Sequence, residues 1–238
     1  MIISSTAIAY LVLTITIVFL NVRFFQYWIE KRDTTSKLFF FFGAIFLLFG
    51  LVRVVTTLFF PENTQILKES VTIVAFLQGV AAAVIAYLVV YLKIPKISPW
   101  VGFVSVFILG MAVTAVTFDL DYKPFLDPSG AINWGFPEVG ALYPILRLFI
   151  LLVAFLPLMV ILFQQFRQAE EAFLKRRSLG LFLSLLLVIG VGFIDFVLND
   201  IFRLGVIYRD YALIVLAVIL FLIIFFTQKP EQLKNTNV

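Results

Sequence analysis

The chain has 238 residues, of which 63% are hydrophobic and 13% charged, with a formal net charge of +4 and a mean hydropathy of +1.10. A soluble globular domain carries about half apolar and about a quarter charged residues, so this composition excludes a soluble fold and indicates an integral membrane protein. Zero Cys and zero His exclude disulfides, thiolate or imidazole catalysis, and metal sites built on those ligands.

Apolar runs long enough to cross a hydrocarbon layer of about 30 Å recur along the chain. We expect spans at residues 2–20, 38–60, 71–92, 99–118, 141–163, 179–201 and 206–227. We expect the first to be a retained helix, because it has no basic n-region and no signal-peptide cleavage site. The alternating pattern of an outer-membrane barrel is absent. The prediction is an all-α, single-domain bundle of seven transmembrane helices.

Charge placement predicts how this bundle is oriented. Lys and Arg residues concentrate in the loops after the first, third and fifth spans and in the C-terminal tail, whereas the other loops hold Lys68, Lys123, Arg203 and Arg209. The positive-inside rule therefore places the N-terminus outside and the C-terminus in the cytoplasm. We expect the protein in a prokaryotic cytoplasmic membrane, with the lipid bilayer as its first partner.

One connection, residues 118–140, is too long for a minimal turn and holds several Pro, Gly, Asp and Asn residues. The predicted topology puts this loop outside, between the fourth and fifth spans. A long segment of this kind is often a lid or a binding element. The alternative is an ordered cap that fills space between helix ends.

A weak internal repeat relates the two halves of the chain. A shift of 142 residues places Ser36 over Ser178 and Arg53 over Asp195. This alignment favours a 3+1+3 plan, with the fourth span as a linker between two parallel three-helix repeats. Arg53 and Asp195 would then lie at equal depth. Because ionisable groups inside a bilayer normally pair, we predict a structural ion pair between these two residues.

Further polar residues gather in the predicted outer third of the layer, whereas the inner half offers mainly hydrocarbon. The candidate ligand-binding residues are Arg147, Gln78, Tyr143, Trp134 and Arg53. Arg147 would supply charge-assisted hydrogen bonds, Gln78 and Tyr143 would orient the ligand, and Trp134 would be an aromatic lid. Such a pocket suits an anionic or amphipathic small ligand. The alternative is a set of side chains that snorkel toward the interface.

Several functional classes are excluded or disfavoured. The last span contains no Lys, which excludes a retinal Schiff base at the position usual in microbial rhodopsins. No Gly-rich phosphate loop is present, and the cytoplasmic loops are too short for an NTPase or kinase domain. We expect no catalytic residues, cofactor, metal or nucleic-acid partner, and therefore no enzyme.

Three features of the chain resemble the organisation of a known protein family. They are the connector FRQAEEAFLKRRS (166–178), the exit FTQKPEQ (226–232) and the long loop between the fourth and fifth spans. With these features the chain resembles the seven-helix sensor regions at the N-termini of some prokaryotic histidine kinases. The resemblance implies a ligand pocket and signalling through the last span into a cytoplasmic output module. Because only residues 228–238 follow Thr227, we expect that module on a separate protein partner.

Three functions stay open. The first is a standalone seven-helix receptor-like or sensory protein with an outward-facing polar pocket. The second is a non-catalytic accessory subunit of a larger membrane complex, for which a Phe-rich surface is natural. The third is a small-solute transporter of the 3+1+3 plan.

Overall fold

The computed structural model describes residues 3–135, 142–194 and 205–228. Within these residues the helices are α1 (Ser5–Lys31), α2 (Thr34–Phe59), α3 (Thr64–Lys93), α4 (Pro99–Asp119), α5 (Leu142–Gln168), α6 (Ala172–Phe193) and α7 (Val206–Thr227). Two short strands, β1 (Phe125–Leu126) and β2 (Ile132–Asn133), form an antiparallel hairpin between α4 and α5. All seven described helices are long and apolar enough to cross a membrane. The predicted seven-helix membrane bundle is thereby confirmed.

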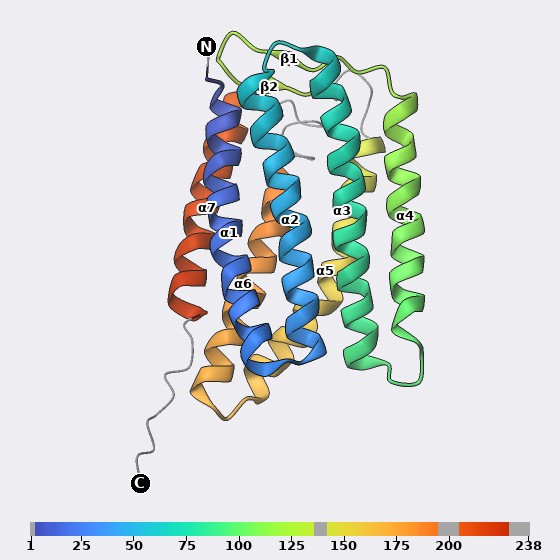
Figure 1. Ribbon diagram of the computed structural model, residues 1–238, viewed down its shortest axis with the longest axis vertical. Helices are drawn as coiled ribbons and strands as arrows, with labels where there is room; N and C mark the ends of the chain where they lie inside the picture. Colours follow the sequence, from blue (N-terminus) through green and yellow to red (C-terminus); the bar gives the residue numbers. More distant parts are fainter. Residues whose placement is uncertain (1–2, 136–141, 195–204, 229–238) are drawn as a thin grey trace.

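Six of these helices form a closed ring in the order α1, α2, α3, α5, α6, α7, with α7 packed against α1. Helix α4 stands outside the ring and packs on α3 and α5 (Figure 1). Because α2, α4 and α5 all cover α3, its membrane segment is the most buried of the seven. Each helix therefore packs against the next one along the chain, and α3 also contacts α5 directly.

Polar residues fix where three of the helices begin. The side chains of Ser4, Asp33 and Asn63 accept hydrogen bonds from the backbone N–H groups three residues later, at 3.1, 2.7 and 3.0 Å. Each satisfies a donor that the first helical turn would otherwise leave open. Pro99 opens α4, where a missing N–H costs nothing.

Four helices extend well beyond the predicted spans: α1 continues to Lys31, α3 begins at Thr64, α5 continues to Gln168 and α6 begins at Ala172. Helical structure therefore continues past the span boundaries predicted at residues 20, 71, 163 and 179. Hydropathy marks only the part of a helix that lies in hydrocarbon, whereas backbone hydrogen bonding continues into the interface with polar side chains attached.

The described part of the long connection folds over one end of the bundle, which we call the hairpin end (top of Figure 1). Asp127 accepts a 2.9 Å hydrogen bond from the Ser129 N–H, which with the Ser129 hydroxyl lowers the pKa of this exposed carboxyl. Gly130 follows with φ of 83°, a conformation that favours glycine. The Gly130 carbonyl accepts a 2.9 Å bond from the N–H of Ser5, which ties the hairpin to the start of α1. The described part of this connection, up to residue 135, therefore covers the hairpin end and is attached to α1.

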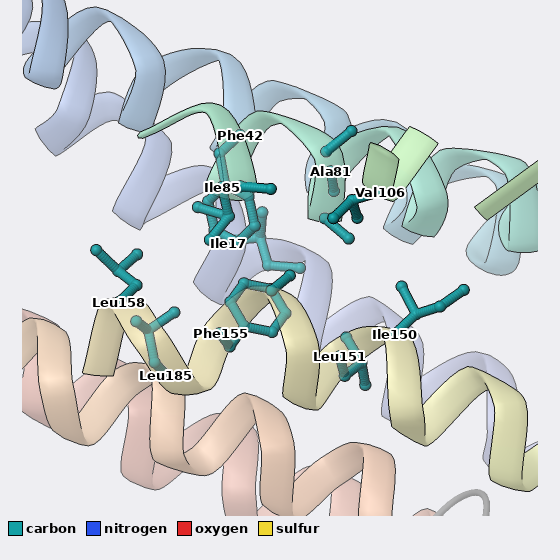
Figure 2. Close-up of a cluster of buried hydrophobic side chains, with 14 of the residues drawn as sticks. Ile17, Phe42, Ala81, Ile85, Val106, Ile150, Leu151, Phe155, Leu158 and Leu185 are labelled. Carbon is teal, nitrogen blue, oxygen red and sulfur yellow. The ribbon is translucent and has the colours of Figure 1, made fainter. Parts of the chain in front are cut away.

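The middle of the bundle is filled by apolar side chains from facing helices (Figure 2). Phe155 on α5 is fully buried and meets Phe42 of α2 edge to face, with ring centroids 5.7 Å apart. Ile17, Ile85 and Leu185 belong to the same buried cluster. This cluster separates the hairpin end from the opposite end, where α1 meets α2, α3 meets α4 and α5 meets α6.

Helices α3 and α4 approach so closely at Gly79 and Gly110 that a Cβ at Gly110 would lie 2.7 Å from the Gly79 Cα. Backbone atoms cannot move aside as a flexible side chain can. We expect Gly110→Leu to push α4 away from α3 and to destabilise the protein by about 1–3 kcal/mol. Thermal unfolding of the purified protein in detergent micelles measures this loss.

Gly190 supplies the matched control, because no described atom lies within 4 Å of the Cβ position there. We expect Gly190→Ala to leave stability unchanged or to raise it by about 0.5–1 kcal/mol, since alanine lowers the conformational entropy of the unfolded chain. Equal losses in both variants would contradict a specific contact between α3 and α4.

Candidate functional site

Arg147 of α5 and Gln78 of α3 form a buried polar pair at the hairpin end. Both Nε and Nη2 of Arg147 donate to the Gln78 Oε1, at 3.1 and 2.8 Å. The guanidinium also lies 5.5 Å from the ring centroid of Tyr143, one turn earlier on α5. Arg147 is only 3% exposed. The structure thus brings together three of the predicted site residues, and it links α3 to α5 through them.

Arg53 of α2 occupies a second buried cluster. Its guanidinium lies 3.9 Å from the Trp134 ring centroid and 5.7 Å from that of Tyr10, and its Nη1 donates to the Ser70 hydroxyl at 3.4 Å. A desolvated contact between a cation and an aromatic face contributes about 2 kcal/mol or more. Trp134 therefore covers Arg53, whereas the sequence placed it as a lid over Arg147. The predicted partner of Arg53, Asp195, lies outside the described residues, so this pair stays a prediction.

Tyr122 connects these two clusters. It follows α4, is almost fully buried, and its hydroxyl donates to the Lys68 carbonyl at 3.2 Å. Burial raises the pKa of the Tyr122 phenol well above its usual range, against the opposing charges of Arg53 and Arg147. Both arginines therefore lie within electrostatic reach of one phenol, and the two clusters are neighbours beneath the cap.

A third cluster at the hairpin end was not predicted as a site. Arg209 and Asp210, in the first turn of α7, form a buried ion pair at 2.8 Å. Arg209 Nη2 also donates to the Ile132 carbonyl at 2.9 Å, and Asp210 Oδ2 accepts from Ser5 and Thr6 at 2.6 and 2.7 Å. This network joins α1, β2 and α7. The available signal was two charged residues inside an apolar span, but they were assigned to the outer loop.

A narrow cavity of about 90 Å³ begins at Arg147 and Gln78 and runs along the ring axis. Its other walls are almost entirely apolar and come from α1, α2, α5, α6 and α7. On α1 the lining extends from Tyr10 to Leu20, which is about 15 Å of helix. The cavity is therefore an apolar tube with a guanidinium and an amide at one end.

The Arg147 guanidinium places a positive charge at one end of the tube, and Gln78 fixes its orientation. Within the described residues no group of three or more Asp and Glu side chains lies close enough to hold a metal ion. Comparisons of the chain with protein-family models, curated proteins and solved structures found no match.

Proposed function

We propose that this chain is a receptor-like sensory protein of a prokaryotic cytoplasmic membrane, and that it binds an anionic amphiphile inside its helix ring. The observation that carries the proposal is the apolar tube that ends at Arg147 and Gln78. The asymmetry of Lys and Arg between alternate loops supports an orientation with the hairpin end outside.

The lining of the cavity favours a ligand with one acidic head and one unbranched hydrocarbon chain, and such a ligand must widen the cavity beyond its volume of about 90 Å³. A hydrocarbon chain that moves from the bilayer into this tube gains little hydrophobic free energy, because lipid tails are as apolar as the leucine and phenylalanine walls. The head therefore decides which ligand binds. The Arg147 guanidinium attracts an acidic head to this end of the tube through its positive charge.

The position of the cavity supports a sensory role. Leu213, Ala217 and Leu220 of α7 line one wall, and Leu13 and Ile17 of α1 line another. The hydrocarbon chain of a ligand held between these two walls would contact α7 directly. α7 is the helix that leads toward the C-terminal residues 228–238. A separate cytoplasmic partner would detect the resulting change in α7.

Binding of radiolabelled dodecanoate to the purified protein in phosphatidylcholine nanodiscs tests this function, with empty nanodiscs as background and dodecanol as the uncharged comparison. We expect saturable dodecanoate binding and none of dodecanol. Arg147→Gln should weaken dodecanoate binding by roughly tenfold or more, since it removes the charged donor.

A filling substitution tests the tube independently of the charge. Ala217→Leu places extra atoms in the cavity wall and should abolish binding, whereas Val215→Leu, on the exposed face of the same helix, should leave it unchanged. Equal binding of dodecanol, or dodecanoate binding that survives both Arg147→Gln and Ala217→Leu, would refute the proposal.

One observation favours a second candidate, the small-solute transporter of the 3+1+3 plan. α1, α2 and α3 follow one another in the ring, α5, α6 and α7 do the same, and α4 lies outside as a linker would. Protein-dependent release of trapped glycerol 3-phosphate from proteoliposomes would decide for this candidate over the sensory protein.

A further inference from the structure

The opposite end of the bundle holds a second and larger cavity, of about 570 Å³. It lies where α2 and α6 begin and where α3 and α5 end, at the bottom of Figure 1. This volume falls in the range of small-molecule sites. Its polar wall was not predicted, because hydropathy ended the fifth span at residue 163, whereas α5 continues to Gln168.

This cavity is distinct from the tube at the hairpin end. Along α5, Leu151 lines the tube and Leu158 lines the larger cavity. Phe155 lies one turn from each, is fully buried, and packs against Phe42 (Figure 2). The two cavities are therefore separated by the central apolar cluster, and each can be altered without the other.

Two cations line the larger cavity. Lys93, at the end of α3, donates from Nζ to the Gln164 Oε1 at 3.0 Å. The Arg177 guanidinium lies 3.8 Å from the Tyr27 ring centroid, so the aromatic face holds it in place. In the part of the chain that the structure describes, neither cation forms a salt bridge with a carboxylate.

The one carboxylate in the lining, Asp33, is already engaged. Its Oδ1 accepts from the Ser36 N–H at 2.7 Å and its Oδ2 from the Ser36 hydroxyl at 3.0 Å, as the N-cap of α2. The starts of α2 and α6 and the ends of α3 and α5 meet at this cavity, so their helix dipoles oppose one another. The side chains of Lys93 and Arg177 therefore make the cavity attractive to an anion.

The remaining lining is divided between hydrogen-bonding groups and an apolar floor. Gln165 and Gln168 offer amides at the exposed mouth, and Ser178 contributes a buried hydroxyl. Phe39, Leu158 and Leu181 form the floor. A bare inorganic anion would leave this floor and the amides without partners, whereas a phosphate ester with hydroxyl groups and carbon atoms contacts all three surfaces.

We propose that this cavity binds the phosphate group of a glycerol phosphate ester, with Lys93 and Arg177 on the phosphate oxygens and the glutamine amides on the glycerol hydroxyls. Two sources share this chemistry. One is the headgroup of an anionic phospholipid such as phosphatidylglycerol, which reaches the cavity from the membrane surface. The other is a soluble phosphomonoester such as glycerol 3-phosphate.

Two binding measurements on the full chain distinguish these sources. Native mass spectrometry in detergent micelles compares retention of phosphatidylglycerol with that of phosphatidylcholine, and equilibrium dialysis measures radiolabelled glycerol 3-phosphate. We expect at least one of the two phosphate esters to bind saturably. Lys93→Gln combined with Arg177→Gln should weaken that binding tenfold or more, because both phosphate contacts are lost.

Charge-matched controls separate a built site from general attraction to a basic surface. Arg176 and Lys96 are exposed, close in sequence to the two cations, and absent from the lining. Lys96→Gln with Arg176→Gln should leave binding unchanged. Lys93→Gln alone, at an exposed position that folding tolerates, should still weaken binding.

Each binding result either supports the proposed phosphate site or overturns it. Selective phosphatidylglycerol retention assigns the lipid source, and glycerol 3-phosphate binding assigns the soluble one. Equal losses in the cavity and control variants, or binding of neither ester, would overturn the proposal. Dodecanoate binding at Arg147 should be unchanged by Lys93→Gln, so this experiment tests the two proposed sites independently.

Discussion

Replacement of Asp210 by alanine should destabilise the protein by about 3–5 kcal/mol, because Arg209 loses the buried carboxylate that neutralises it. The same substitution removes the acceptor of Ser5 and Thr6, at 2.6 and 2.7 Å. Asp210→Asn keeps the shape but not the charge and should show most of the loss. Equilibrium unfolding in mixed micelles measures all of these free energies.

Two comparisons make this result specific. Replacement of both partners, Arg209→Met with Asp210→Leu, should recover part of the loss, since no buried charge then lacks its complement. Glu69→Ala removes an exposed carboxylate from the same end of the bundle, where Gln65 donates a 2.8 Å hydrogen bond to it, and should cost less than about 1 kcal/mol. Similar losses for Asp210→Ala and Glu69→Ala would contradict the importance of the network.

Arg53→Met should produce the second large loss, about 2 kcal/mol or more from its contacts with the Trp134 and Tyr10 rings. A double-mutant cycle with Trp134→Leu isolates the contact across the 3.9 Å separation. We expect the double variant to lose less than the sum of the single variants. Strict additivity in the cycle would show that the cation and the ring do not stabilise each other.

The predicted ion pair between Arg53 and Asp195 has its own test. If the pair forms, Asp195→Ala adds a cost of about 3–5 kcal/mol, and the exchange Arg53→Asp with Asp195→Arg recovers part of it. Unfolding in the same micelles compares the single and exchanged variants. Additive single losses with no recovery on exchange would mean that Arg53 and Asp195 do not pair.

Much of the fold was predictable because hydropathy is a strong one-dimensional signal. The spans predicted at 99–118 and 206–227 match α4 and α7 within a residue. The direct contact of α3 with α5 was not predictable, since apolar helices give no sequence signal of which faces meet. The extensions of α1, α3, α5 and α6 were missed because their polar residues lower the hydropathy without ending the helix.

In the candidate site, too, some features were predictable from the sequence and others depend on tertiary structure. Depth follows from helix rise, so Arg147, Gln78 and Tyr143 were correctly grouped at one level. The partner of Trp134 depends on how the hairpin folds over the bundle, which is a tertiary property. The sequence could show that an indole lies near the helix ends, but not that it would cover Arg53.

The network of Arg209 and Asp210 also constrains how the last helix can move. It attaches the start of α7 to α1 and to β2, so that end of α7 is a fixed pivot. α7 has 22 residues, and a rod of about 33 Å held at one end moves at the other only by tilting. A tilt of about 5° would displace the far end by about 3 Å, whereas side chains beside the pivot would barely move. A small tilt of α7 about this fixed end thus becomes a larger displacement at Thr227, by leverage alone.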